Sequence, residues 1–275
     1  MKAAPLRPAP YRVRRIKREL HGVTTLELVP AQGAVPAFEP GQFNMLYAFG
    51  VGEAAISISG DPAQADCLTH TVREMGAIST ALAQAHPGTM LGVRGPFGTA
   101  WPTRAAEGLD VVLIAGGLGL APLRPAILRL LAARPLYGRL ILLYGARSPN
   151  ELLYRHELEH WRQRLDVDIH VTVDYADAGW HGNVGVVPRL IPRLGLDAQN
   201  TLAMVCGPEV MMRFCGAALH DAGVAMDRIH LSMERNMKCA LGLCGHCQFG
   251  ADFICKTGAV MRYDQVAQRL RLREI

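Results

Sequence analysis

Residues 109–123 read LDVVLIAGGLGLAPL, and this stretch decides the fold of the central part of the chain. Its first half is a continuous apolar run, which is typical of a strand buried on both faces of a parallel sheet. Glycines end the run, and a helical pattern follows from Pro122 to Ala133. The stretch therefore predicts a strand, a tight glycine turn and a helix, which together form one βα unit.

The same alternation of strand and helix recurs toward the C-terminus. Repeated units of this kind predict a parallel sheet covered by helices, with a ligand crevice at the carboxyl ends of its strands. We expect this α/β nucleotide-binding domain at residues 103–232. Its further strands are expected in RLILLYGAR (139–147), DVDIHVTVD (166–174), TLAMVCGPE (201–209) and DRIHLSMER (227–235), and its further helices at 151–164, 187–194 and 210–222.

The N-terminal part has a different pattern, in which glycine and proline separate short β-like runs. Regularly spaced short strands predict an antiparallel barrel or sandwich. A single helix is expected at 78–85, and the composition changes around 101–108, so we place this domain at residues 1–102. The expected strands are 11–16, 24–29, 42–48, 54–59, 68–72 and 90–94.

Four cysteines near the C-terminus form a C-x4-C-x2-C-x7-C array, and they are Cys239, Cys244, Cys247 and Cys255. The first three have the spacing of plant-type ferredoxins, in which four thiolates hold a [2Fe-2S] cluster. The glycines of this segment and the small Ala240 allow the backbone to curl so that N–H groups face anionic sulfur. A four-cysteine zinc site stays open as an alternative, although it favours paired C-x2-C spacings. We predict a small metal-binding domain at residues 233–275.

Three loops at predicted strand ends carry candidate nucleotide-binding residues. Bare glycine backbone before a helix can approach a pyrophosphate, and an arginine at the next strand end can reach a ribose or its 2′-phosphate. Tight packing or a surface charge also explains each residue alone, but three loops at one sheet edge favour a site. The candidates are Gly116, Gly117 and Gly119 in the first loop, Arg147 and Ser148 in the second, and Cys206, Gly207, Pro208 and the helix residue Met212 in the third.

The composition, with 50% hydrophobic and 19% charged residues, is that of a globular protein. The longest apolar run, 111–123, is interrupted and falls short of the roughly 18 residues that a membrane span needs. The basic start of the chain lacks the apolar segment of a secretory signal, so we expect a cytoplasmic protein without membrane insertion. Seven of the first twenty residues are Lys or Arg, but without interleaved aromatics they do not indicate nucleic-acid binding. We interpret them as the polar side of a first strand, with partner docking as the alternative.

Six segments carry a resemblance to known proteins: GEAAISIS (52–59), HTVR (70–73), GVRGPFGTAWP (92–102), YGARSPNELLYRHEL (144–158), CGPEVMM (206–212) and MERNMKCALGLCGHCQFGADFICKTG (233–258). They resemble the ferredoxin-reductase superfamily, in the branch with a C-terminal [2Fe-2S] domain, from about Tyr11 to Asp264. Within it, the chain most resembles the gamma subunit of cytoplasmic NiFe hydrogenases (sulfhydrogenases). It is also similar to the reductase subunit of anaerobic sulfite reductase and to the electron-transfer subunit of dihydroorotate dehydrogenase.

That resemblance implies that the N-terminal barrel binds FAD and that the glycine loop holds the NAD(P) pyrophosphate. It implies further that Cys206 and Gly207 border the nicotinamide and that Glu234 lies near the flavin. Many members carry Arg-x-Tyr-Ser where this chain has AAIS (54–57), so Arg73 is the candidate substitute for the missing arginine and weaker FAD retention is expected. The implied FAD residues are Ala55, Ile56 and Ser57, then Thr71, Val72 and Arg73 on an adjoining strand, and Gly76, Ile78, Ser79 and Thr80 at a helix start that suits the pyrophosphate.

The resemblance implies an NAD(P)H-dependent oxidoreductase subunit with FAD and a [2Fe-2S] cluster, which converts hydride transfer into single-electron transfer. No centre for hydrogen, sulfur or orotate chemistry is visible, so partner subunits with iron–sulfur and catalytic centres are implied, a NiFe hydrogenase first. A sulfite-reductase or dihydroorotate-dehydrogenase subunit is the second hypothesis, and a four-cysteine zinc protein that binds a nucleotide without redox turnover is the third. Both NAD and NADP stay open, although Arg147 and Ser148 suit a 2′-phosphate. We interpret His246 as a packing residue and leave His70 unassigned.

Overall fold

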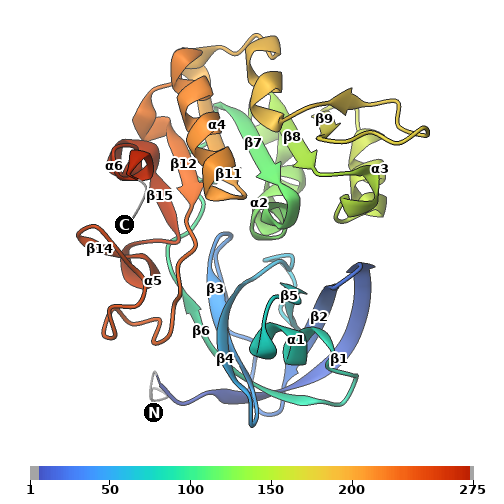
Figure 1. Ribbon diagram of the computed structural model, residues 1–275, viewed down its shortest axis with the longest axis vertical. Helices are drawn as coiled ribbons and strands as arrows, with labels where there is room; N and C mark the ends of the chain where they lie inside the picture. The colour runs from blue at the N-terminus through green and yellow to red at the C-terminus, as the bar shows by residue number, and fades with distance from the viewer. Residues whose placement is uncertain (1–5, 273–275) are drawn as a thin grey trace. The chain divides into compact units, whose positions relative to one another are not determined.

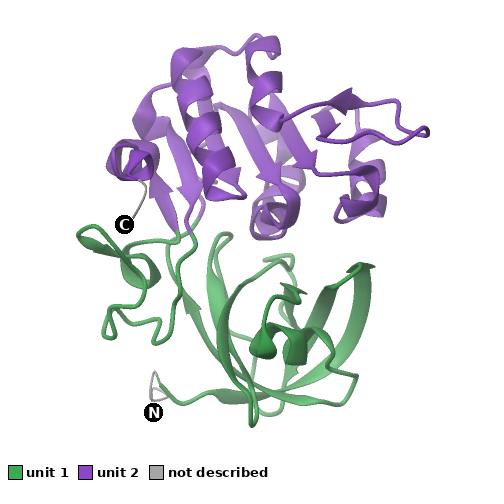
Figure 2. Ribbon diagram, viewed as in Figure 1, with its two compact units in different colours: residues 1–100, 234–259 green, residues 101–233, 260–275 purple. Residues whose placement is uncertain are grey.

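The computed structural model describes residues 6–272 and divides the chain into two compact units (Figure 2). Unit 1 comprises residues 1–100 and 234–259, and unit 2 comprises residues 101–233 and 260–275. The expected third domain, 233–275, is therefore shared between the units. The physical reason is that Val260–Arg262 forms a strand in the sheet of unit 2, whereas the Thr99 N–H of unit 1 donates to the Gly258 carbonyl at 2.6 Å. Lys2, one of the basic residues at the start, lies outside the described residues.

Unit 1 contains a six-stranded antiparallel sheet in the order β4-β3-β6-β1-β2-β5 (Figure 1). An antiparallel bridge between Ile58 and His70 joins the β4 side of the sheet to β5, so the sheet closes into a barrel. All six strands expected from the sequence are present, with ends shifted by a few residues. They are β1 (Ala9–Leu20), β2 (Val23–Pro30), β3 (Phe43–Ala48), β4 (Gly52–Ser57), β5 (Leu68–Arg73) and β6 (Met90–Phe97).

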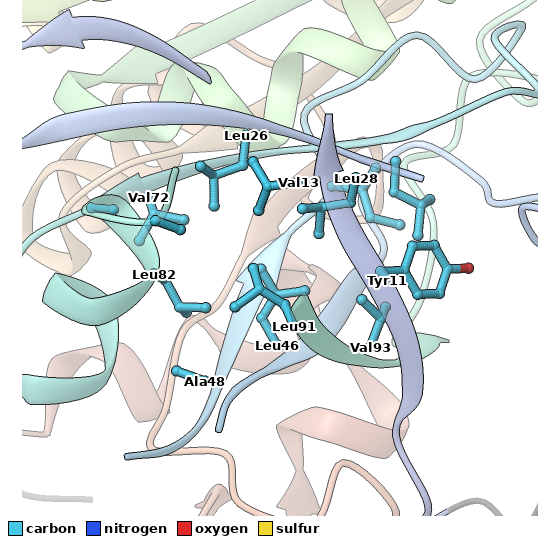
Figure 3. Packing of buried hydrophobic residues seen from close by; sticks show 14 of the residues in the cluster. Tyr11, Val13, Leu26, Leu28, Leu46, Ala48, Val72, Leu82, Leu91 and Val93 are labelled. Carbon is cyan, nitrogen blue, oxygen red and sulfur yellow. The ribbon is translucent and has the colours of Figure 1, made fainter. Parts of the chain in front are cut away.

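The barrel core is built from side chains that alternate along these strands, as the period of two requires (Figure 3). Leu26 and Leu28 of β2 are fully buried, and Leu46 of β3 and Leu82 of helix α1 (Ala77–Ala83) pack in the same cluster. The residues between the inward-facing ones point to the other face of the sheet. The core therefore fixes which strand residues are available to contact other segments or a ligand.

Unit 2 contains a seven-stranded sheet in the order β10-β9-β8-β7-β11-β12-β15. The first six strands run parallel, as predicted, but β15 pairs antiparallel with β12, so the sheet is mixed. At three residues, β15 is too short to give a periodic signal in the sequence. The strands are β7 (Asp110–Gly116), β8 (Leu140–Ala146), β9 (Asp168–Val173), β10 (Asn183–Val184), β11 (Thr201–Cys206), β12 (Ile229–Ser232) and β15 (Val260–Arg262).

The helices of unit 2 follow the prediction with two differences. The helix expected at 151–164 begins later, because a 3-10 turn, η3 (Pro149–Glu151), precedes α3 (Arg155–Arg162). The helix expected at 187–194 is the 3-10 helix η4 (Val187–Arg193), which contains Pro192, a residue without an N–H to donate. The remaining helices are α2 (Leu120–Ala132), α4 (Glu209–Asp221) and α6 (Tyr263–Val266), with 3-10 turns at η1 (Gly117–Gly119), η2 (Arg134–Leu136), η5 (Ala198–Asn200), η6 (Met226–Arg228) and η7 (Arg269–Arg271). Among residues 6–272, no helix has the length and apolar character to cross a bilayer.

The four clustered cysteines lie in the part of unit 1 that follows unit 2 in sequence, residues 234–259, which we refer to as the cysteine segment. It has little regular structure beyond a two-stranded ribbon, β13 (Gln248–Phe249) and β14 (Asp252–Phe253), and the single turn α5 (Ile254–Thr257). Phe249 and Ile254 are buried and give the segment a small core. The Arg235 guanidinium lies 4.5 Å from the centre of the Phe249 ring.

Candidate functional site

Backbone N–H groups of the cysteine segment point at cysteine sulfur, as the sequence predicts. The Leu241 and Leu243 N–H groups donate to Cys239 Sγ at 3.3 Å, and the Gly242 N–H donates to Cys255 Sγ at 3.2 Å. The backbone turns back on itself because Ala240 has φ +60°, and Gly242 and Gly245 have φ +72° and +78°. An alanine in the left-handed region is uncommon, and here it starts the loop that supplies these donors.

The thiols of Cys239 and Cys244 are close enough to influence each other's pKa, and Cys247 is close enough to Cys255 to raise the pKa of Cys255. Cys244 is exposed, whereas Cys247 and Cys255 are buried. Within residues 6–272, His, Cys, Asp and Glu side chains form no group of three or more with the geometry of a single metal-ion site. The prediction of a metal centre therefore stays a prediction.

The surroundings of Cys239 and Cys244 affect the thiol pKa differently from those of Cys255. Burial alone would raise the pKa of the Cys239 thiol, but backbone hydrogen bonds from Leu241 and Leu243 outweigh it and lower the pKa. A hydrogen bond with the His246 backbone is the main cause of the lowered pKa of Cys244. Burial, followed by the hydrogen bond with Cys247, raises the pKa of Cys255 to about 12. Cys239 and Cys244 thus lie in surroundings that favour the thiolate, whereas Cys255 lies in surroundings that favour the thiol.

Strand β4 carries the residues expected next to a flavin, and it is half-buried along its whole length. Ile56 packs on the barrel core, whereas the Ser57 carbonyl accepts a hydrogen bond from His70 Nδ1 at 3.0 Å. On β5, Val72 packs in the barrel core, and Thr71 Oγ1 lies 2.9 Å from Thr25 Oγ1 of the neighbouring strand β2. Both side chains therefore contact other residues of the barrel. Arg73 is partly exposed at the end of the strand.

His70 is fully buried, and the residues around it fix its protonation state. Because its Nδ1 donates to the Ser57 carbonyl, its Nε2 accepts from Asn44 Nδ2 at 3.1 Å. Burial lowers the pKa of His70 to about 4, although hydrogen bonds with the Ser57 and Ile56 backbone oppose the shift. His70 is therefore neutral near pH 7 and holds the end of β4 through its Ser57 contact.

Ser79, one of the residues expected to contact a pyrophosphate, forms hydrogen bonds with the backbone at the start of helix α1. The N–H groups of Met75 and Gly76 both donate to Ser79 Oγ at 3.0 Å, and that hydroxyl donates to the Gly76 carbonyl. Ile78 lies on the inner face of the helix, packed against the barrel core, and the Thr80 N–H donates to the Gly76 carbonyl at 2.9 Å. The Ser79 hydroxyl thus orders this turn.

In unit 2, the three predicted loops start from neighbouring strands. β8, β7 and β11 lie side by side and parallel, so Gly116, Ala146 and Cys206 end at the same edge of the sheet. A Cβ atom on Gly119 would overlap the Cys206 carbonyl, and a Cβ atom on Gly116 would overlap the sulfur of Met211. The structure therefore brings the first and third loops together at a distance that only glycine allows.

The remaining predicted residues lie in the third and second loops of this edge and after β12. A Cβ atom on Gly207 would lie 3.0 Å from Gly116 N, and Pro208 caps α4, in which Met212 is buried. Arg147 is exposed and Ser148 partly buried after β8, next to a pocket of about 360 Å³ lined in part by Arg155 and Trp180. The exposed Glu234 belongs to unit 1 and follows β12 in sequence.

Three groups that hold these loops and the cysteine segment in place were not among the residues predicted from the sequence. Tyr144 is fully buried on β8, where its hydroxyl donates to the Gly117 carbonyl at 3.2 Å and accepts from the Leu153 N–H at 2.9 Å. Met211 fills the space that the glycines leave. Arg94 of β6 forms an ion pair with Glu53 and donates to the Cys239 carbonyl. Polar residues inside apolar strand patterns were the available signal for Tyr144 and Arg94.

Comparison with known proteins identifies the family. The model of the oxidoreductase NAD-binding domain matches residues 113–216. This range includes the sheet edge formed by Gly116, Gly117 and Gly119, which we refer to as the glycine edge. The sulfhydrogenase 1 gamma subunit of Pyrococcus furiosus is 33% identical over 268 residues, which cover 92% of each chain. The chain belongs to the ferredoxin-reductase superfamily, in the group of these gamma subunits. It is therefore an NAD(P)H-dependent flavin oxidoreductase.

Two further members of the superfamily are similar to the chain. A probable electron-transfer subunit of dihydroorotate dehydrogenase B (NAD(+)) from Methanocella arvoryzae is 33% identical over 224 residues, which cover 81% of this chain and 78% of the relative. A chain in the structure of an NADH-dependent reduced ferredoxin–NADP oxidoreductase matches with a TM-score of 0.73 over 100% of this chain and 96% of its own. At 22% identity, this last match shows that the ferredoxin-reductase fold is shared.

Proposed function

We propose that this protein transfers electrons between NAD(P)H and a partner redox enzyme, using FAD bound to the barrel and a [2Fe-2S] cluster bound to the cysteine segment. When bound, these groups would supply hydride acceptance at the flavin and single-electron transfer at the cluster. The observation that carries the proposal is the set of four thiols with backbone N–H groups directed at them, in a member of this family.

The donor set of the cysteine segment fits an iron–sulfur cluster. Thiolates are the preferred ligands of iron in such clusters, and N–H groups directed at sulfur help to set their potential. A [2Fe-2S] cluster needs two protein ligands on each iron, and the segment supplies four thiols, of which Cys239 lies near Cys244 and Cys255 near Cys247. We propose Cys239 and Cys244 as the ligands of one iron, and Cys247 and Cys255 as the ligands of the other.

The barrel offers a flavin surface on β4 and at the start of α1. Strand β4 is half-buried throughout, which is consistent with a face left for a ligand, and His70 holds its Ser57 carbonyl in place. We propose that Ser57 and the backbone of Ala55 and Ile56 contact FAD, with the β5 residues 71–73 alongside. The helix start formed by Gly76, Ile78, Ser79 and Thr80 would receive the pyrophosphate through the N–H groups of Ile78 and Ser79, since the N–H groups of Gly76 and Thr80 already donate within the turn.

In unit 2, we propose that the edge formed by Gly116, Gly117 and Gly119 holds the NAD(P) pyrophosphate. Its support is the close backbone approach between the first and third loops and the match of the NAD-binding family model to this region. Cys206 and Gly207 would border the nicotinamide, followed by Pro208 and Met212. Arg147 and Ser148 would contact the ribose side, and they suit a 2′-phosphate.

The partner of the proposed electron transfer is a larger redox complex. Two matched relatives are named as gamma subunits of sulfhydrogenases, and one of them covers 92% of this chain. We propose the iron–sulfur and catalytic subunits of a NiFe hydrogenase as the partners. The dihydroorotate dehydrogenase type is the second candidate, because its electron-transfer subunits align with 81% of this chain.

The test is the visible absorption spectrum of the full chain, purified without oxygen, before and after addition of NADPH or NADH. We expect flavin and iron–sulfur bands that bleach with the preferred nucleotide. A colourless protein that contains zinc would contradict the redox proposal and support the four-cysteine zinc alternative. Iron–sulfur bands without flavin would show that the AAIS (54–57) departure weakens FAD retention, and added FAD should then restore the nucleotide-dependent bleaching.

A further inference from the structure

Arg94 is a buried arginine on β6 whose side chain points away from the barrel core. Val93 and its register partner Leu46 face the core, so Arg94 and its partner Met45 lie on the outer face of the sheet. Although it faces outward, the Arg94 side chain is only 4% exposed. Its Nη1 donates to the Cys239 carbonyl at 3.1 Å, which places the cysteine segment over it.

Glu53 of β4 holds the guanidinium in one orientation. Arg94 Nε and Nη2 donate to the two carboxylate oxygens of Glu53 at 2.8 and 2.6 Å, and the guanidinium carbon lies 5.6 Å from the centre of the Phe97 ring. A buried charge is costly unless it is paired, and a two-point contact fixes the plane of the guanidinium. The remaining nitrogen is thereby aimed at the Cys239 carbonyl.

We propose that Arg94, oriented by Glu53, is a positioning residue that fixes the cysteine segment relative to strand β4. The contact is made to the backbone of the first cysteine, immediately before Ala240, where the loop turns. The N–H groups of Leu241 and Leu243, which donate to Cys239 Sγ, follow within four residues. An anchor at the Cys239 carbonyl therefore fixes the start of the loop that presents sulfur and its donors.

The proposal deepens the proposed function, because β4 and the cysteine segment are the elements to which flavin and cluster are assigned there. The anchor connects the two elements through one side chain. It also places a cation next to the first proposed ligand. Net charge and hydrogen bonding around a cluster set its reduction potential, and a nearby cation favours the reduced state, which carries more negative charge.

The anchor can be tested without any cofactor by hydrogen–deuterium exchange on the full chain. In Arg94→Met, we expect the Leu241 and Leu243 amides to exchange about tenfold faster, as expected when a hydrogen bond to a charged donor is lost. Arg94→Met with Glu53→Gln removes the unpaired carboxylate as well and should show the same loss of protection. The matched control is Arg124→Met, which breaks the Arg124–Glu157 ion pair of unit 2 at 2.7 Å and should leave both amides unchanged.

Unchanged exchange in Arg94→Met would overturn the proposal, and so would protection restored in the double variant, because the loss would then come from the uncompensated charge of Glu53. If Arg94→Met does not fold, Arg94→Lys decides the question. Lysine keeps a cation next to Glu53 but lacks the fork that reaches Cys239. Faster exchange of the two amides at an unchanged melting temperature supports the anchor, and unchanged exchange overturns it.

A second measurement separates this proposal from the proposed function. In cluster-loaded protein, Arg94→Met should shift the midpoint potential of the cluster to more negative values, and Arg124→Met should not. An unshifted potential would overturn the electrostatic part of the proposal. If the chain holds zinc in place of iron while the exchange result stands, the redox function fails and the anchor survives.

Discussion

The cysteine segment of unit 1 and the glycine edge of unit 2 are both tight loops, but different forces form them. In the cysteine segment, polar groups attract one another: N–H groups donate to sulfur and an arginine holds a carbonyl. In the glycine edge, the loops approach closely because Gly116 and Gly119 have no side chain to keep them apart. The first arrangement depends on which chemical groups are present, and the second depends on which atoms are absent.

The largest effect is expected from Cys247→Ser, which tests the chemical side of this comparison. Serine keeps the size of the residue but removes the soft thiolate that iron requires. We expect the iron content of the purified protein to fall by at least about tenfold, with loss of the iron–sulfur absorption.

The matched control for this variant is Cys215→Ser, because Cys215 is also buried but lies in α4 of unit 2. It should retain iron. Equal loss in both variants would indicate general destabilisation, and full iron content in Cys247→Ser would exclude that residue as a ligand.

The next largest effect is expected from His70, which belongs to a buried hydrogen-bond network in the barrel. Its contribution to stability depends on its protonation state. His70 is neutral in the folded state with a pKa of about 4, compared with 6.5 for the ordinary side chain. Its stabilising contribution is therefore fully present above pH 6.5 and is lost as the pH falls toward 4, because the unfolded chain takes up the proton first. Over this range the free energy of unfolding falls by about 3 kcal/mol because of His70.

Urea unfolding of unit 1 signals at pH 7 and pH 4 measures this dependence. His70→Gln should lower the stability at pH 7 but remove about 3 kcal/mol of its dependence on pH. His86→Gln alters an exposed histidine of the same unit and should retain the full dependence. A pH dependence that survives in His70→Gln would show that other groups produce it.

The steric side of the comparison is tested by Gly119→Ala. The added methyl group would overlap the Cys206 carbonyl, and such overpacking costs about 2 kcal/mol with a displaced loop. We expect nucleotide binding to weaken by about tenfold, since the displaced backbone belongs to the proposed pyrophosphate site. Isothermal titration with NADPH and thermal unfolding measure the two effects.

Two alanine variants serve as controls for overlap. Gly117 has φ +52° and Gly195 has φ +55°, and a Cβ atom at either position would meet no atom within 4 Å. Both changes should cost about 1 kcal/mol through the backbone conformation alone. Gly195→Ala should leave nucleotide binding unchanged. If Gly119→Ala binds as tightly as Gly195→Ala, the close approach of the loops is not required for the site.

Much of the fold could be predicted because it follows from local patterns. The six barrel strands and the apolar strands of the parallel sheet were read from periodicity and glycine punctuation. Strand β15 was not, because three residues carry no period, and the helix expected at 187–194 is the 3-10 helix η4, since Pro188 and Pro192 occur in an otherwise helical pattern. These elements are decided by contacts with distant parts of the chain.

The candidate sites divide in the same way. The cysteines and glycines could be recognised because their types and spacings are unusual. No local pattern marks the Arg94–Glu53 pair, whose members are 41 residues apart, or the Arg94–Cys239 contact, whose members are 145 residues apart. An arginine in a strand pattern predicts a surface charge until the segment that buries it is known.

The smallest effect is expected from Tyr144→Phe. This variant tests both parts of the comparison, because the Tyr144 hydroxyl is a polar group that forms a hydrogen bond with the glycine loop. The Tyr144 hydroxyl supports the glycine loop through the Gly117 carbonyl and satisfies the buried Leu153 N–H. Its removal leaves that N–H without this acceptor, so we expect unfolding free energy to fall by about 1 kcal/mol and nucleotide affinity to fall by about threefold. Tyr175→Phe, at an exposed position of the same unit, should change neither quantity. A loss of affinity without a loss of stability would mean that the hydroxyl acts mainly through Gly117, and a loss of stability alone would mean that the glycine edge is held by its sterics and does not need this hydrogen bond.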